Sequence, residues 1–311
     1  MKILVTGGAG FIGSHVVDKY TSDGHDVAVV DNLSTGSRSN LNSKARFYDA
    51  DIRDAGVIDG IFQREHPDVV NHHAAQVDVR KSVEDPVFDA TSNILGSLQL
   101  IHASVKHNLR KFIYVSTGGA VYGEPKYLPV DEDHPLHPES QYGISKHTVE
   151  HYLYLYKRHS GLTYTVLRYP NVYGPRQNSK GEAGVIAIFV GQMLEGVTPT
   201  IFGNGEQLRD YVHVDDIVRV NSLALTGGDN EIFNIGSGVG TTVNRIYRLL
   251  SDLLSFRQEP NYAVLRTGEI QRIYLSAQRA YEQLGWKSEI PIEEGLRLTL
   301  DWFTKKMALS D

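Results

Sequence analysis

Three glycines at positions 7, 10 and 13 separate a short apolar run from a helix-like stretch at the start of the chain. The run Ile3-Leu4-Val5 has the character of a buried strand, and the stretch after the glycines ends near Asp23. Gly7 allows a tight turn, Gly10 lets a pyrophosphate approach the backbone, and Gly13 lets helix and strand pack closely. Strand, turn and helix together predict a dinucleotide site, with the phosphates over the positive end of the helix.

A second apolar run, Val27-Ala28-Val29-Val30, ends in Asp31. In a fold of this kind the carboxylate at that place meets the hydroxyls of the adenosine ribose, and it repels a 2′-phosphate. The sequence therefore predicts NAD rather than NADP. The remaining alternative is a glycine-rich loop of an α/β protein that binds nothing.

Apolar β-type runs alternate with helical stretches along the first half of the chain. Strands are expected near 46–48, 68–70, 112–115 and 164–167, and helices near 55–64, 86–107 and 143–159. Nearly continuous apolar strands separated by helices predict an α/β fold with a doubly wound parallel sheet, the Rossmann arrangement. Ligands then gather at the carboxyl ends of the strands.

After about Pro170 the predicted elements become shorter, and glycine and proline become more frequent. We expect helices near 185–194, 242–254 and 292–303, and strands near 200–202 and 232–234. Residues 1–169 are interpreted as the dinucleotide-binding domain, to which later segments return, and residues 170–311 as mainly a smaller α/β substrate-binding lobe.

Composition narrows the class of protein. The 311 residues contain no cysteine, which excludes disulfides and thiolate chemistry and fits a reducing compartment, and the formal net charge is -6. No broad basic field exists for nucleic acid, and no run is long enough to span a membrane. The chain enters a strand directly, leaving no room for a signal peptide, so we expect a cytoplasmic protein. His147 and His151 have helical zinc spacing but lack a third ligand, so no metal is expected.

Tyr142 and Lys146 begin the helix after a proline-rich stretch, and a spacing of four places both side chains on one helical face. A phenol with an ordinary pKa of about 10 is a poor base at neutral pH. A nearby ammonium and a positive nicotinamide both favour the phenolate, which predicts a usable base after the fifth strand of an NAD fold.

At these residues the chain resembles the extended short-chain dehydrogenase/reductase superfamily and, within it, the UDP-glucose 4-epimerases. The resemblance runs almost end to end. The stretches that carry it are 6–14, 31–36, Asp51-Ile52, Ala74-Ala75-Gln76, Asn93, 116–123, 142–146, 168–176, 209–216, and Arg266 with Gly268-Glu269.

The resemblance implies a role for each matching residue. It makes Tyr142 the base, Lys146 its partner and Thr117 the hydroxyl that hydrogen-bonds the substrate. The NAD-binding residues would be Gly7, Gly10, Phe11, Ile12, Gly13, Asp31, Asn32, Ser34, Thr35, Gly36, Asp51, Ile52, Ala74, Ala75, Gln76 and Asn93, together with Tyr142 and Lys146. The UDP-sugar would meet Thr117, Tyr142, Asn171, Val185, Arg209, Arg266, Glu269 and Ile273.

One departure concerns the catalytic hydroxyl. Gly118 stands where many epimerases have a Ser or Thr, so either Thr117 or Ser116 must supply this group, and Thr117 is our prediction. Gly118-Gly119 also replaces the carboxylates that related dehydratases and decarboxylating enzymes need after the Thr. Oxidation and re-reduction of the sugar carbon remain, which is epimerisation at C4 through a transient 4-keto sugar.

The alternatives left open are a 4-epimerase of UDP-N-acetylhexosamines or UDP-uronic acids, a net NAD-dependent oxidoreductase, and a non-catalytic protein on the same fold. Ile273 is expected to line the sugar pocket and favour UDP-glucose and UDP-galactose, or else to fill the core below it. The aromatic residues Tyr152, Tyr154 and Tyr156 are expected to pack against another helix, either of this chain or of a second subunit, and we expect a homodimer.

Overall fold

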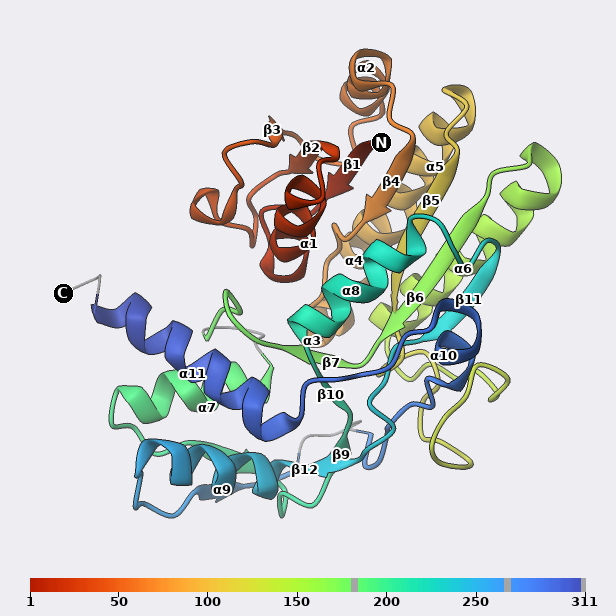
Figure 1. The fold of residues 1–311 in the computed structure, drawn as a ribbon. Helices are drawn as coiled ribbons and strands as arrows, with labels where there is room; N and C mark the ends of the chain where they lie inside the picture. The colour runs from red at the N-terminus through yellow and green to blue at the C-terminus, as the bar shows by residue number, and fades with distance from the viewer. Residues whose placement is uncertain (180–183, 266–269, 309–311) are drawn as a thin grey trace.

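A seven-stranded parallel sheet organises the computed structural model, which describes residues 1–179, 184–265 and 270–308. The strand order is β11-β6-β5-β4-β1-β2-β3 (Figure 1). The bounds are β1 Lys2–Thr6, β2 Asp26–Asp31, β3 Arg46–Asp49, β4 Val69–His72, β5 Lys111–Thr117, β6 Tyr164–Tyr169 and β11 Glu231–Asn234. The chain reverses its direction of winding between β1 and β4, where ligands of such sheets bind.

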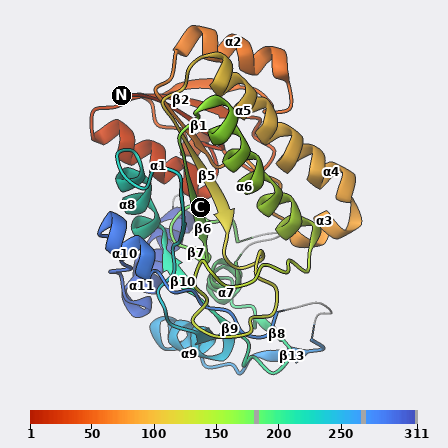
Figure 2. The same cartoon turned by 90° about the vertical axis from the view of Figure 1, so that its right-hand side faces the viewer.

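Helices cover both faces of the sheet, so its strands are buried on both sides. One face carries α1 Phe11–Ser22, α8 Val214–Ala224 and α10 Gln278–Leu284. The other carries α2 Ala55–Glu65, α5 Gly96–Lys106 and α6 Gln141–Ser160 (Figure 2). A separate hydrophobic cluster lies on each face, which confirms the predicted doubly wound fold.

The helix expected over 86–107 is interrupted. After α3 Val79–Glu84 the chain forms α4 Pro86–Ala90, a π-helical turn over Thr91–Leu95, and then α5. Asn93 is the buried residue of that turn. Since a π turn inserts one residue into the helical repeat, it turns Asn93 toward the loop after β4.

The second lobe is built from three helices and three two-stranded sheets. The helices α7 Val185–Leu194, α9 Val243–Leu254 and α11 Ile292–Ala308 enclose a third hydrophobic cluster. The sheets pair β7 Asn171–Tyr173 with β10 Tyr211–His213, β9 Leu208–Arg209 with β12 Thr241–Thr242, and β8 Thr200–Phe202 with β13 Asn261–Ala263. Figure 2 shows this lobe below the carboxyl ends of the main strands.

After β10 the chain returns to the main sheet, where α8 covers one face and β11 joins the edge beside β6, with Phe233 opposite Leu167. Phe233 is fully buried in the cluster that also holds residues of α1 and α8. The chain after Tyr169 therefore contributes to both parts of the molecule.

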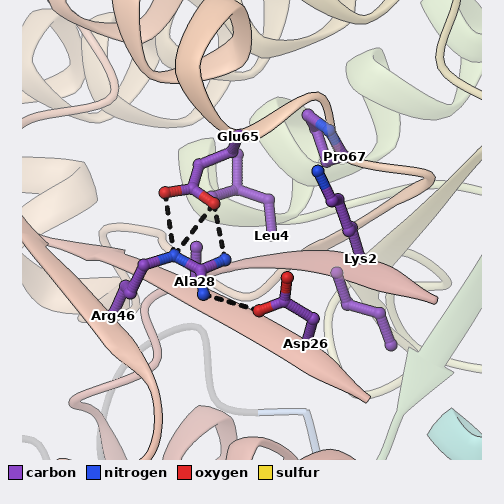
Figure 3. Close-up of a pocket in the computed structure, with 8 residues that line it drawn as sticks. Lys2, Leu4, Asp26, Ala28, Arg46, Glu65 and Pro67 are labelled. Carbon is purple, nitrogen blue, oxygen red and sulfur yellow. Dashed lines mark hydrogen bonds and ion pairs between the residues drawn. The ribbon is translucent and has the colours of Figure 1, made fainter.

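The amino ends of the strands are closed by ion pairs. Arg46 donates to both oxygens of Glu65, at 3.0 Å from Nε and 2.6 Å from Nη2, and to Asp26 at 2.6 Å (Figure 3). These groups fill the hollow at the end of the sheet opposite the glycine turn. They stabilise the fold and take no part in the candidate site.

Among the described residues, no helix combines the length and the apolar character that crossing a membrane requires.

Candidate active site

The glycine turn has no room for side chains. Gly7 has φ +70°, and a Cβ there would lie 2.7 Å from the amide nitrogen of Ala74. A Cβ on Gly13 would lie 2.2 Å from the carbonyl oxygen of Gly7, and one on Gly10 would lie 3.1 Å from the same atom. Gly10 is the N-cap of α1, and no side chain caps this helix end. The first amides of Phe11, Ile12 and Gly13 therefore form the positive helix end that a pyrophosphate fits.

Asp31 ends β2 next to this turn and is 8 % exposed. Its carboxylate accepts hydrogen bonds from the amides of Ala9 at 3.0 Å and Leu33 at 2.8 Å. A Cβ on Gly36 would lie 3.0 Å from Asp31 Oδ1, so the loop of Ser34, Thr35 and Gly36 passes directly beside the carboxylate. Carboxylate lone pairs remain for ribose hydroxyls, and the residues present fit an NAD adenosine half.

The loop after β3 is held by charge. Asp51 accepts from Asn32 Nδ2 at 2.9 Å and pairs with Arg53 at 2.7 Å, and the Arg53 contact holds the pKa of Asp51 well below its usual range. Ile52 follows and packs against Gly96, since a Cβ added to Gly96 would lie 2.7 Å from Ile52 Cδ1. Asn32, Asp51 and Ile52 thus lie together at the carboxyl edge of β2 and β3.

Asn93 fixes the loop after β4, where Ala74, Ala75 and Gln76 lie. Its amide group donates to the carbonyl of Gln76 at 3.0 Å, to Asp89 at 3.0 Å and to Ser145 Oγ at 3.1 Å, and its oxygen accepts from the Gln76 amide at 2.8 Å. Ser145 belongs to α6. The π turn therefore connects the cofactor loop to the helix that carries Tyr142 and Lys146.

The structure separates the two candidate hydroxyls. The side chain of Thr117 lies next to Tyr142 and opposes the rise in the pKa of Tyr142. Ser116 is buried and donates to Glu150 Oε1 at 2.6 Å. The Ser116 hydroxyl is thus already engaged by Glu150, whereas Thr117 is the residue next to Tyr142. The arrangement favours Thr117.

Gly118 lies under the second lobe. A Cβ at this position would lie 2.3 Å from Leu275 Cδ1. Leu275 is 1 % exposed, and its amide donates to Asp210 at 3.0 Å. A Ser or Thr at residue 118 would have to displace the Leu275 side chain.

Burial changes the ionisation of both residues of the catalytic pair. It raises the pKa of Tyr142 to about 12, which the hydrogen bond from Thr117 partly opposes. It lowers the pKa of Lys146 to about 7, against the negative charges of Glu150 and Asp89. The protein's own groups therefore do not lower the pKa of Tyr142 toward neutrality as expected, because the desolvation of the phenolate outweighs their effect. The positive nicotinamide must supply the opposing charge.

The residues predicted to bind the substrate lie mainly on the short sheets of the second lobe. Asn171 begins β7 and its amide donates to the carbonyl of Asp210 at 3.0 Å. Arg209 ends β9 beside Asp210, whose buried carboxylate accepts from Ser237 Oγ at 2.5 Å and from the Leu275 amide. Val185 is the first residue of α7. Arg266 and Glu269 lie outside the described residues.

Ile273 is 2 % exposed and packs in a small cluster with Val121, Tyr122, Val130 and Leu275. Its amide donates to the carbonyl of Leu208 at 3.1 Å. The side chain thus lies in the layer that joins the catalytic loop to the second lobe. This position agrees with the core-filling interpretation, and lining of the sugar pocket stays a prediction.

Two buried acids near Lys146 were not identified from the sequence as site residues. Asp89 contacts Gln76 and Asn93, and Glu150 contacts Ser116, His147 and Arg168. The sequence could have indicated Glu150, because it lies one helical turn after Lys146 on the same helix. Within the described part of the chain, no group of three His, Cys, Asp or Glu residues is arranged to hold a metal.

Residues 3–236 match the model of the NAD dependent epimerase/dehydratase family. The Thermotoga maritima UDP-glucose 4-epimerase, solved with UDP-glucose, is 52% identical, with 99% of this chain and 100% of that chain covered and a TM-score of 0.98. The Thermus thermophilus UDP-glucose 4-epimerase, solved with NAD, is 41% identical over 98% and 99% of the two chains, with a TM-score of 0.93. The Mycolicibacterium smegmatis UDP-glucose 4-epimerase is 41% identical over 98% of this chain and 99% of its own length.

Proposed function

The chain belongs to the NAD dependent epimerase/dehydratase family, and on that premise we propose that it interconverts UDP-glucose and UDP-galactose by inverting carbon 4 of the hexose. The observation that supports this most strongly is the placement of Thr117 next to Tyr142 beside a glycine turn fit for NAD. The protein is an NAD-dependent UDP-glucose 4-epimerase in this proposal, with a transient 4-keto sugar as intermediate.

Tyr142, Thr117 and Lys146 carry out the proton transfer in this mechanism. Tyr142 as phenolate takes the proton of the sugar 4-hydroxyl, and Thr117 hydrogen-bonds the same oxygen. Lys146 lies four residues from Tyr142 on one helical face, so its ammonium stabilises the phenolate and reaches the nicotinamide ribose. When the 4-keto sugar is reduced on its opposite face, Tyr142 returns the proton to the oxygen on carbon 4. This gives the opposite epimer and closes the cycle.

NAD, held by the glycine turn and Asp31, supplies the reversible hydride acceptor when it is bound. Helix α1 orients the pyrophosphate through its first amides, and Asp31 selects an unphosphorylated ribose. Asp51, Gln76 and Asn93 fix the loops on either side of that cradle. The same cofactor molecule serves both half-reactions, so the protein has no need to release it.

Inversion requires that the hexose turn while the nucleotide stays fixed. Arg209 and Asn171 lie on two short strands that Asp210 joins, and they are our candidates for the UDP anchor, with Arg266 as a third. A guanidinium is suited to a pyrophosphate because it donates two parallel hydrogen bonds. We infer that residues 1–169, with β11 and α8, hold the cofactor and that residues 170–311 mainly hold UDP.

We also propose a homodimer that forms through α6. Ile144, Tyr154 and Leu155 on this helix are 51%, 50% and 45% exposed. Ile144 and Leu155 lie eleven residues apart, which is three turns, so they share one face. Replacing both with Glu is expected to convert a dimer into a monomer in a molar-mass measurement by light scattering.

A cytoplasmic location and a role in galactose metabolism complete the proposal. A chain without cysteine suits a reducing compartment, and the reaction interconverts the glucose and galactose forms of one nucleotide sugar.

Product analysis tests the function. Purified protein incubated with UDP-galactose should yield a mixture with UDP-glucose, without steady growth of the reduced-nicotinamide absorbance. Continuous NADH release would instead identify a net oxidoreductase. Conversion of only N-acetylated or uronic acid forms would overturn the substrate assignment.

A further inference from the structure

Glu150 is a buried carboxylate where α6, β5 and β6 meet. It lies on α6 and is 4 % exposed. Its oxygens accept hydrogen bonds from Ser116 on β5 at 2.6 Å and from Arg168 on β6 at 2.6 and 3.0 Å. His147 Nδ1 lies 3.0 Å from the second oxygen. None of these contacts reaches substrate or cofactor residues directly.

We propose that Glu150 is a positioning residue of the reaction: it holds α6 against β5 so that Tyr142 meets Thr117, and it places a buried carboxylate one helical turn from Lys146. The inference rests on the proposed roles of Tyr142 and Lys146 in epimerisation.

The clamp follows from the order of residues along two elements. Ser116 immediately precedes Thr117 on β5, and Glu150 lies two turns after Tyr142 on α6. The Ser116–Glu150 hydrogen bond therefore fixes the register of the helix against the strand that carries the catalytic hydroxyl. Arg168 joins the same carboxylate to β6 and also donates to Tyr122 at 2.7 Å. The clamp thus includes the loop after Thr117.

The electrostatic part follows from burial. Lys146 is 3 % exposed and its Nζ lies 4.4 Å from the centre of the Tyr114 ring, a weak partner for a full charge. Desolvation lowers the pKa of Lys146 to about 7, and the charge of Glu150 is the largest influence that opposes it. The pKa of Glu150 itself is held low, because hydrogen bonds from His147, Arg168 and Ser116 outweigh its desolvation. It therefore stays anionic at neutral pH.

Other charged or titratable groups also face Lys146. Asp89 on α4 adds a second negative charge. Burial lowers the pKa of His72, at the end of β4, and of His73, which follows it, and the charge of Lys146 lowers both further, so both remain neutral. Tyr114 on β5 has a raised pKa and stays protonated, with its hydroxyl donating to the carbonyl of Lys146. Glu150 and Asp89 are thus the two anions of this environment.

The decisive experiment compares Glu150→Gln with the wild-type holoenzyme. Near-ultraviolet phenolate absorbance is titrated in each protein and corrected with Tyr142→Phe in the same background. Loss of the anion should leave Lys146 neutral more often, so Tyr142 should ionise roughly one pH unit or more higher. The acid limb of kcat should move in the same direction, and kcat at neutral pH should fall about tenfold while the KM for UDP-galactose stays within about twofold.

Three further variants separate charge from structure. Glu150→Gln with Arg168→Gln removes both charges, so it tests the same shift without leaving a buried cation unpaired. Ser116→Ala weakens the clamp but keeps the anion, so kcat should fall with no shift of the titration. Glu65→Gln breaks the Glu–Arg pair at the opposite end of the sheet, shown in Figure 3, and should lower stability without moving either profile.

An unshifted phenolate titration in both the single and the double variant would overturn the charge role. Wild-type kcat in Ser116→Ala would overturn the clamp. The phenolate titration needs no turnover, so it stands even if UDP-galactose proves not to be the substrate.

Discussion

Leu275 lies against Gly118 so closely that a Cβ on residue 118 would come within 2.3 Å of Leu275 Cδ1. The segment that carries Leu275 is held on both sides, since Val130 donates to the carbonyl of Tyr274 and accepts from the amide of Ser276. The second lobe thus presses directly on the catalytic loop. This contact leaves little room for a side chain at residue 118.

Gly118→Ser should damage the enzyme rather than add a useful hydroxyl. The new side chain must displace Leu275, and overpacking of this kind costs about 1–3 kcal/mol of unfolding free energy. Chemical denaturation and turnover of UDP-galactose measure both effects. Gly119→Ser is the matched control, because a Cβ there has only an ordinary contact at 3.8 Å with Thr117 Oγ1. Adding Leu275→Ala to Gly118→Ser should recover stability, and no recovery would show that another contact excludes the side chain.

Tyr142→Phe should lower turnover by roughly two to four orders of magnitude, since the phenol transfers the proton. UDP affinity should remain near that of the wild type, because the phenol does not anchor the nucleotide. Steady-state kinetics and calorimetric titration with UDP separate the two. Thr117→Ala, which removes the partner of the phenol, should cost less, and near-normal turnover of Tyr142→Phe would remove the residue from its role.

Protein purified without added nucleotide should carry NAD(H), because Asp31 stands where a 2′-phosphate would meet a carboxylate. Acid release followed by chromatography identifies the nucleotide. Recovery of NADP(H), or activity that depends on added NADP⁺, would contradict this interpretation of Asp31.

Arg209→Ala should weaken UDP binding by about 1.5–3 kcal/mol, the value of a charged hydrogen bond. Calorimetric titration with UDP measures the change. Arg248 on α9 is an exposed arginine of the same lobe, so Arg248→Ala serves as the control and should bind UDP normally. Equal affinity in both variants would place the pyrophosphate elsewhere.

UDP-glucose and UDP-galactose should be preferred over their N-acetylated forms, because a branched apolar side chain at Ile273 offers an acetamide no hydrogen bond and little room. The ratio of kcat/KM for UDP-galactose and UDP-N-acetylgalactosamine measures the preference. Ile273→Ser should shift the ratio toward the acetylated sugar, whereas Leu128→Ser, in the same cluster, should lower stability alone. An unmoved ratio would leave Ile273 as a core residue, in agreement with its 2 % exposure.

Local pattern in the sequence was enough for the parts of the site that lie within one element. The glycine turn between β1 and α1 could be predicted because a tight turn and a close helix each exclude side chains at fixed spacing. Tyr142 and Lys146 could be placed on one face because an α-helix repeats every 3.6 residues. The parallel sheet followed from apolar strands separated by helices.

Contacts between distant segments could be decided only by the tertiary structure. The choice of Thr117 over Ser116 depends on Glu150, 34 residues away, which takes the Ser116 hydroxyl. The place of β11 at the sheet edge depends on Phe233 reaching the cluster beside β6.

The exclusion of a side chain at residue 118 depends in the same way on Leu275 from the second lobe. The sequence by itself determined which residues are chemically able to act. The tertiary structure decided which of them face one another, because burial, the main influence on the pKa values of Tyr142 and Lys146, is a property of the packed chain and not of local spacing.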